Sequence, residues 1–148
     1  MRVYRDMQSF VLSQATEVST HHVCCLAADL PTPIPNTGTA DFAAADSLKR
    51  PLLTKAAKKL LSDERFAELR IQLEGFKEDN PWVLESALFD CLKREGERAQ
   101  LCWWDWEPKI RDRDAATLEA LREKHADDIE IFIAVQLLFD RQWKSLKV

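Results

Sequence analysis

Glycine is scarce in this chain of 148 residues, which contains only Gly38, Gly75 and Gly96. A chain with so few glycines has few places where its backbone can adopt positive φ or approach a phosphate closely. The sequence also lacks any GxGxxG, Walker-type or GxSxG pattern. These absences exclude glycine-rich nucleotide loops and the nucleophile elbow of serine hydrolases.

Long apolar runs and an excess of positive charge are missing as well. No uninterrupted apolar stretch reaches the ~18 residues that a membrane-spanning helix needs. The formal net charge is −4, and basic stretches such as KAAKK (55–59) are interspersed with apolar residues. We therefore expect no membrane span and no nucleic-acid partner.

The four cysteines, Cys24, Cys25, Cys91 and Cys102, do not show the repeated spacing of a disulfide framework or a zinc ribbon. The stretch HHVCC (21–25) superficially resembles a metal site. Structural zinc sites, however, usually take pairs of ligands that are separated by about two to four residues and brought together by a turn. We expect a reducing compartment, no metal and no cofactor.

Helical periodicity dominates from Phe42 onward, whereas residues 1–29 are poorly periodic and prolines at 31, 33 and 35 indicate an extended connector. Apolar residues recur at helical spacing over about 42–61, 66–76 and 81–94, with Asp63 and Asn80 as candidate caps and Pro51 as a kink or a restart. No series of short Val/Ile-rich runs alternates with these helices. The predicted fold is mainly α, with a poorly structured segment at 1–29 and a helical part at 30–148.

The last predicted helix begins after Asp114 and ends near Lys147. Its main apolar stripe contains Leu118, Leu121, His125, Ile129, Phe132, Gln136, Phe139, Trp143 and Leu146. Other faces of its middle part are apolar too, so we expect this helix to be buried nearly all round. An unbroken helix of this length would approach ~50 Å, longer than a domain of this size readily encloses. The length predicts a break near His125 or a missing neighbour, and His125 itself is interpreted as a packing residue.

The segment LCWWDWEPKIRDRD (101–114) concentrates three of the five tryptophans of the chain. Trp103, Trp104 and Trp106 are candidates for stacking on a ligand such as a sugar. They are equally candidates for a structural wedge, since a buried tryptophan removes ~150–250 Å² from water, worth at most ~4–6 kcal/mol. We favour the wedge, with Trp82 and Trp143 as packing partners and at most one of the three rings left for ligand. The following RDRD run is interpreted as a helix cap plus ion pairs and not as an acid/base pair.

Three ordered segments resemble the 4-alpha-glucanotransferases of glycoside hydrolase family 77, which includes amylomaltase and the plastid disproportionating enzyme. They are NPWVLESALFDCLKRE (80–95), WWDWEPKIRDRD (103–114) and DDIEIFIAVQLLFDRQWKSLK (127–147). LPTPIPNTGTADFAAADSLKRPLLTKAAKKLL (30–61) is similar to the plant-type members in particular. The combination of the tryptophan cluster with RDRD and with Phe132, Gln136, Phe139 and RQW (141–143) is unusual, and the resemblance covers residues 30–148.

The resemblance implies a retaining transglycosylase that transfers α-1,4-glucan segments to another glucan or to glucose through a covalent glucosyl-enzyme intermediate. It also implies a (β/α)8 barrel with inserted helical subdomains, of which this chain would hold an inserted helical part and a flanking helix. The catalytic carboxylates of the family are expected downstream of Val148. No catalytic residue is therefore assigned in this chain, and we expect it to be inactive alone.

The implied partners are α-1,4-glucans and maltooligosaccharides in starch and maltodextrin metabolism. The implied compartment is the plastid if the protein is of the plant type, and the cytoplasm otherwise. An alternative is a non-catalytic helical module for protein interaction or glucan binding.

Overall fold

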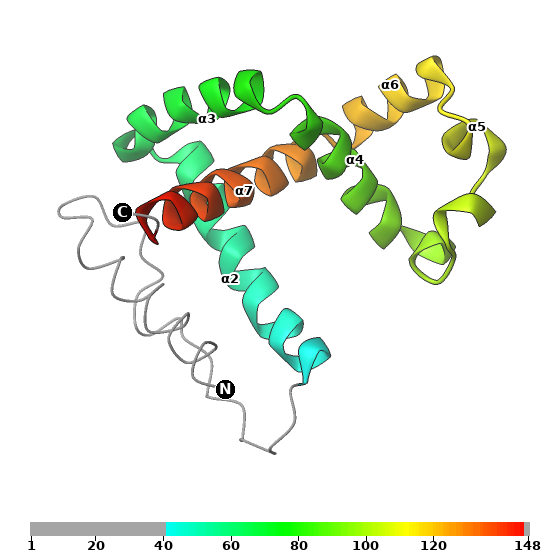
Figure 1. Ribbon diagram of the computed structural model, residues 1–148, viewed down its shortest axis with the longest axis horizontal. Coiled ribbons are helices and arrows are strands. Elements are labelled where there is room, and N and C mark those ends of the chain that lie inside the picture. Colours follow the sequence, from blue (N-terminus) through cyan, green and yellow to red (C-terminus); the bar gives the residue numbers. More distant parts are fainter. Residues whose placement is uncertain (1–40, 147–148) are drawn as a thin grey trace. The chain divides into compact units, whose positions relative to one another are not determined.

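The tryptophan-rich chain is described between residues 41 and 146 by a computed structural model, and this part is almost entirely helical (Figure 1). No strand occurs between these two residues, which confirms the prediction of a mainly α structure. The HHVCC stretch, the proline connector and the boundary expected at residue 30 lie outside the described residues. The chain divides into two compact units between Leu69 and Arg70.

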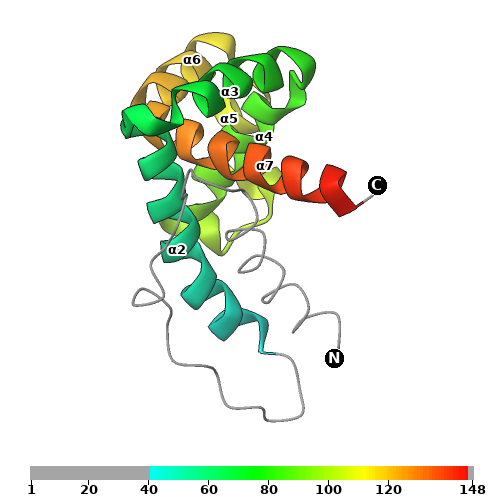
Figure 2. The same ribbon diagram turned by 90° about the vertical axis from the view of Figure 1, so that its left-hand side faces the viewer.

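The described part of the first unit consists of α2 (Phe42–Ser62), η2 (Glu64–Phe66) and the first turn of α3 (Ala67–Asp79). Asp41 caps α2, because its carboxylate accepts a hydrogen bond of 2.9 Å from the backbone N–H of Ala44. The helix continues through Pro51 as one element, so the restart that this proline could have caused does not occur (Figure 2). Ala57 and Leu60 are fully buried.

Asp63 ends α2 and begins η2, as the sequence predicts for a cap. Its backbone N–H donates to Lys59 O (3.0 Å), and its carboxylate accepts from the backbone N–H of Arg65 (3.0 Å) and from the Arg65 guanidinium (2.5 Å). These hydrogen bonds favour the ionised form and lower the pKa of Asp63 from 3.8 to about 2.

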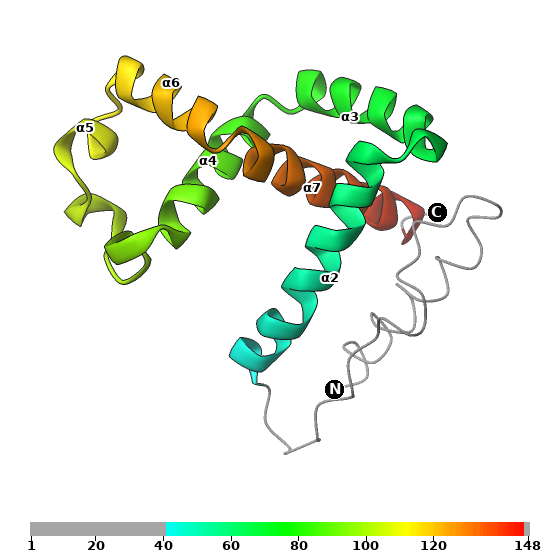
Figure 3. The ribbon, with the colours of Figure 1, turned by 180° about the vertical axis from the view of Figure 1, so that it is seen from behind.

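The second unit holds the remainder of α3, α4 (Trp82–Arg94), the segments between α4 and α6, α6 (Ala115–Lys124) and α7 (Ala126–Leu146). Helix α4 packs across α7, as Figures 1 and 3 show from opposite sides. The residues of this unit that are at least nine-tenths buried include Leu73, Phe76, Val83, Ala87, Leu88, Cys91, Leu92, Trp106, Leu118, Ile129, Ile133, Ala134 and Leu137. Burial also raises the pKa of the Cys91 thiol, which suits a packing role.

Asn80 does not cap α4 with its side chain, so that part of the prediction is wrong. Its amide nitrogen donates to Phe76 O (3.0 Å), at the end of the preceding helix α3, and its amide oxygen accepts from Trp82 Nε1 (3.2 Å). Pro81 precedes the first residue of α4 and has helical backbone angles. Asn80 therefore closes α3, and Pro81 begins the next turn.

The predicted break in the final helix is confirmed at His125. Asp114 caps α6 by accepting from the backbone N–H of Thr117 (2.9 Å), and α6 ends at Lys124 before α7 begins at Ala126. Because the chain turns at His125, α7 need not continue the axis of α6.

The buried face of α7 differs from the predicted stripe. Ile129, Ile133, Ala134 and Leu137 are buried, whereas Phe139, Trp143 and Leu146 are each more than half exposed. The expectation of burial nearly all round is therefore wrong for the last two turns. Helix α4 contacts α7, and the buried residues lie on a face that is rotated around α7 from the side with Phe139 and Trp143.

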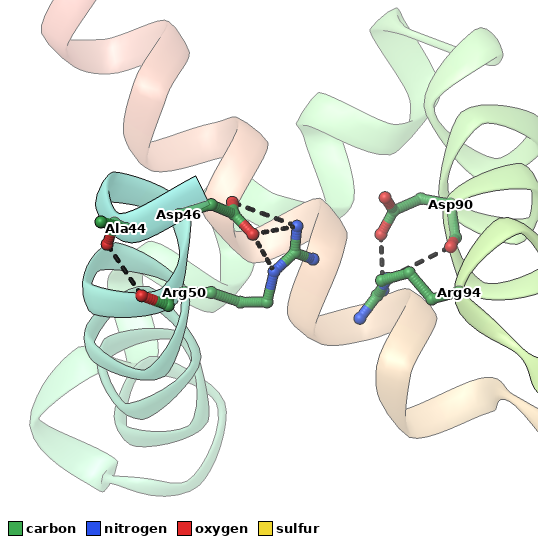
Figure 4. Close-up of polar contacts among 6 residues, drawn as sticks. Ala44, Asp46, Arg50, Asp90 and Arg94 are labelled. Carbon is green, nitrogen blue, oxygen red and sulfur yellow. Dashed lines mark hydrogen bonds and ion pairs between the residues drawn. The ribbon is translucent and has the colours of Figure 1, made fainter. Parts of the chain in front are cut away.

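Ion pairs between side chains occur in both units. Arg50 pairs with Asp46 one turn away on α2 (3.0 Å), and Arg94 pairs likewise with Asp90 on α4 (2.5 Å) (Figure 4). Exposed pairs of this kind contribute only about 0.3–0.5 kcal/mol each. Between helices of the second unit, Lys77 on α3 donates to Glu130 on α7 (2.7 Å).

Candidate functional site

The segment between α4 and α6, residues 95–114, is named here the tryptophan loop. It contains two single 3-10 turns and one short helix, namely η3 (Gly96–Ala99), η4 (Trp103–Asp105) and α5 (Pro108–Arg111). Gly96 begins the loop with φ of +55°, a conformation that glycine adopts without steric cost. Figure 1 shows the loop arching from the end of α4 to the start of α6.

Trp106 anchors the tryptophan loop to α4. The side chain is 5% exposed and its ring stacks on Phe89 of α4, with 5.3 Å between ring centroids and 24° between planes. Stacked aromatic pairs contribute about 0.5–1.5 kcal/mol beyond the area they bury. One tryptophan of the cluster is therefore the structural wedge that the sequence predicts.

Lys93, near the end of α4, holds the first half of the tryptophan loop. Its ammonium group donates to three backbone carbonyls in succession, Arg98 O (3.3 Å), Ala99 O (3.3 Å) and Leu101 O (2.5 Å). Arg98 and Ala99 are the last two residues of η3, and Leu101 lies two residues beyond it, so Lys93 ties the end of this turn to α4. The loop is thus held at one point by Lys93 and at another by Trp106.

Trp103 and Trp104 are not part of the wedge, which corrects the expectation that at most one ring of the cluster stays free. They are 53% and 56% exposed, and their rings meet edge to face with centroids 5.8 Å apart and planes at 78°. Consecutive side chains in a 3-10 turn point about 120° apart, so both rings cannot enter the same core. They form an exposed aromatic corner on η4.

The expected packing partners of the cluster are also corrected. Trp82 is 53% exposed, with its indole N–H donated to Asn80. Trp143 stacks on Phe139 of its own helix, with centroids 6.3 Å apart. The partner of Trp106 is Phe89, a residue that sequence reasoning did not single out. Its spacing from Cys91 and Leu92 places Phe89 at the edge of the α4 stripe, and this is the one signal that could have found it.

A hollow of about 490 Å³ lies within the tryptophan loop. Four carboxylates and one guanidinium are among its lining groups. The lining residues are Glu95, Gly96, Glu97, Arg98, Leu101, Asp105, Trp106, Glu107 and Pro108. The charged groups of this lining are mostly acidic, so the hollow disfavours an anionic ligand.

Glu95 joins the start of the loop to the junction between α6 and α7. Its carboxylate accepts from Lys124 and from Arg98 Nη2 (2.6 Å), and His125 Nε2 lies 3.4 Å away. The hydrogen bond from Lys124, together with the charges of Lys124 and Arg98, lowers the pKa of Glu95. Glu95 therefore stays ionised and serves as an ion-pair centre and not as a proton donor. The side chain of His125 is mostly buried, as expected for a packing residue, but its Nε2 makes no hydrogen bond within residues 41–146.

Glu85 forms a similar centre between α4 and the end of the loop. It accepts from Arg113 and from Arg122 (2.6 Å), and these hydrogen bonds lower its pKa. Arg111 pairs with its neighbour Asp112 (2.7 Å) and lowers the pKa of that carboxyl. With Asp114 capping α6, the RDRD run is a cap plus ion pairs, which confirms its interpretation.

Two further findings bear on the class of site. Within residues 41–146, no three His, Cys, Asp or Glu side chains come together as metal ligands. None of the helices in this part combines the length and the apolar character that crossing a bilayer requires.

Comparison with known protein families identifies this arrangement of helices and tryptophans. A family model described as 4-alpha-glucanotransferase matches residues 4–148. The chain belongs to the 4-alpha-glucanotransferase family. This confirms the resemblance that the three ordered segments carry.

Curated members of the family show which branch this chain resembles. It is 38% identical over 122 residues to the chloroplastic/amyloplastic 4-alpha-glucanotransferase of Solanum tuberosum, covering 80% of this chain and 20% of the relative. The chloroplastic/amyloplastic enzyme of Oryza sativa subsp. japonica is 37% identical over 123 residues, with the same coverage. The 4-alpha-glucanotransferase of Aquifex aeolicus is 24% identical over 110 residues, or 74% of this chain and 21% of the relative. The chain thus spans about a fifth of the length of the curated relatives it matches.

Proposed function

We propose that this chain forms a helical part of a 4-alpha-glucanotransferase, which transfers α-1,4-glucan segments to an acceptor glucan or to glucose. The observation that carries this proposal is the family match over residues 4–148, supported by identities of 37–38% to plant relatives with that name. Transfer to a sugar hydroxyl by the retaining mechanism needs two carboxylates and no cofactor. The partners are α-1,4-glucans and maltooligosaccharides.

The catalytic carboxylates, in this proposal, belong to a barrel outside these 148 residues. The acidic groups that surround the tryptophan loop support this, since Glu85 and Glu95 have lowered pKa values and are held in ion pairs. A general acid for glycoside transfer needs the opposite, a raised pKa. The exposed Phe139 and Trp143 on α7 suit a helix that packs against such a barrel.

A plastid location is part of the same proposal. The plant relatives that resemble the chain carry chloroplastic/amyloplastic names, whereas the Aquifex relative is less similar. The division of the chain into a divergent segment (1–29) and a family segment (30–148) also remains a proposal.

The test compares the 148-residue chain with the longest product of its gene, both incubated with maltotriose. We expect the longest product to release glucose together with longer maltodextrins, and the 148-residue chain to release neither. A folded longest product without transfer would refute the transferase function. Glucose and longer maltodextrins from the 148-residue chain would refute the claim that the catalytic carboxylates lie elsewhere.

The alternative function, a non-catalytic glucan-binding module, is favoured by one specific observation. Two of the three clustered tryptophans stay exposed although the loop that carries them is anchored at other residues. The longest product of a gene for such a module would bind maltodextrin but show no transfer, so binding and transfer measured on that product separate the alternatives.

A further inference from the structure

We propose that Trp103 and Trp104, together with the acidic hollow lined by their neighbours in the tryptophan loop, form a contact surface for a neutral α-1,4-glucan chain. This inference rests on the proposed function for the identity of the ligand. The surface would hold the glucan by stacking and hydroxyl hydrogen bonds and would take no part in bond cleavage.

The first argument is that the two rings are not needed to hold the loop. Trp106 and Lys93 fix the tryptophan loop at two points, through the stack on Phe89 and the three carbonyl contacts. Trp103 and Trp104 sit on the turn between these points and leave more than half of their surface in water. A large apolar ring that is exposed on an already anchored turn is typical of a binding surface.

The second argument is the angle between the rings. Planes at 78° form a corner in which one indole presents its face and the other its edge. Pyranose rings have apolar C–H faces that stack on indole, and successive α-1,4-linked glucoses turn their faces progressively. A corner therefore matches a curved glucan better than it matches a flat extended ligand.

The third argument is charge. Glu97, Asp105 and Glu107 give the hollow an acidic rim, with Arg98 as the one cation among its lining residues. Phosphates, nucleic acids and acidic peptides are repelled by such a rim. A neutral polyol is not repelled, since carboxylates accept hydrogen bonds from sugar hydroxyls and a guanidinium donates to them.

A second exposed aromatic pair of the same unit provides a matched control. Phe139 and Trp143 are exposed to a similar degree, at 54% and 51%, but they stack nearly parallel on one face of α7. They lie on a regular helix, α7, and not on an irregular loop. This pair has the geometry of a protein-packing face and should not bind sugar.

The test is isothermal titration of the 148-residue chain with maltoheptaose, and with cellohexaose as the β-1,4-linked control ligand. We expect W103A/W104A to weaken maltoheptaose binding about tenfold or more, and F139A/W143A to change it by less than about twofold. W103F/W104F keeps an aromatic face at both positions and should retain most of the affinity. Circular dichroism and the melting temperature of each variant establish that it is folded.

Unchanged binding by folded W103A/W104A would overturn the inference, as would equal loss in F139A/W143A or a folded chain that binds no maltoheptaose. Equal affinity for cellohexaose would overturn the assignment to α-1,4-glucan. Failure of the inference and failure of the proposed function are distinguishable. An active longest product with no glucan binding at Trp103 and Trp104 refutes only the inference. Glucan binding by a folded longest product that shows no transfer refutes only the transferase.

Discussion

Arg113 lies in the left-handed region of backbone space, and this gives a prediction about stability that can be worked through in numbers. Its φ is +62°, and among the described residues it is the one residue other than glycine that has a positive φ. The surrounding hydrogen bonds, Asp114 N–H to Lys109 O (2.8 Å) and Arg113 N–H to Ile110 O (3.2 Å), are those of a Schellman motif at the end of α5. Glycine usually occupies this position, because a side chain there costs about 1 kcal/mol or more.

The Arg113 side chain offsets part of this cost by pairing with Glu85, which also keeps Arg122 as a partner. Exposed pairs of this kind contribute about 0.2–1 kcal/mol. Arg113→Ala loses the pair and keeps the strained backbone, whereas Arg113→Gly loses the pair and relieves the strain. We therefore expect R113G to be more stable than R113A by about 1 kcal/mol and to lie within about 0.5 kcal/mol of the unmodified chain.

Urea unfolding followed by circular dichroism at 222 nm measures these differences, which correspond to roughly 4 °C in melting temperature. Gly96 provides a control in which a side chain is added at a positive φ, so the expected change in stability has the opposite sign to that from R113A to R113G. Its φ is +55° and no atom lies within 4 Å of a Cβ added there, so Gly96→Ala tests backbone strain without steric contact. We expect G96A to lose about 1 kcal/mol. Equal stability of R113A and R113G, or a neutral G96A, would refute the reasoning.

Two more predictions concern burial and pH. In urea titrations, Trp106→Ala should lower the free energy of unfolding by about 3 kcal/mol or more, and Trp103→Ala should lower it by less than about 0.5 kcal/mol. The reason is that only the Trp106 ring is buried against Phe89. Similar losses from the two variants would contradict this placement of the rings. The pKa of Asp63 is about 2 in the folded chain and 3.8 when unperturbed, so its stabilising contribution is present above about pH 4 and is lost as the pH falls toward 2. Asp63→Asn should flatten this part of the profile of stability against pH, and an unchanged acid slope would show that the pairing of Asp63 with Arg65 does not persist in solution.

Helix positions were largely predictable from the sequence because the residues that begin and end the helices give strong, local signals. Asp41, Asp63 and Asp114 each accept a hydrogen bond from a backbone N–H two or three residues later, and such caps depend only on neighbouring residues. The length of the last apolar stretch predicted either a break near His125 or a missing neighbour, since a domain of this size does not readily enclose a ~50 Å helix, and the structure shows the break. The same reasoning failed for Asn80, because its side-chain amide donates back to Phe76 O and does not cap α4. The sequence pattern is compatible with a contact to the preceding helix or to the following one.

The tryptophan loop was only partly predictable. Its composition indicated that the cluster was important, and one of its three rings does act as a wedge. Which ring does so depends on the turn geometry of η4 and on Phe89 of α4, which precedes the three tryptophans by 14 to 17 positions. Periodicity carries no information across such a separation, so the division into one buried and two exposed rings required the structure.

The wrong face assigned to α7 is itself informative about function. Two of the three aromatic side chains of the helix, Phe139 and Trp143, are exposed, while the smaller Ile133 and Ala134 are fully buried. If α7 packed only against its own unit, hydrophobic burial would favour burying the aromatic rings and exposing smaller side chains. Each exposed aromatic ring loses a few kcal/mol of favourable burial free energy. The helix therefore has more apolar surface than its own unit covers. A chain that spans a fifth of its relatives' length is where such a surplus is expected, since the rest of the family's fold supplies the missing contact in our proposal.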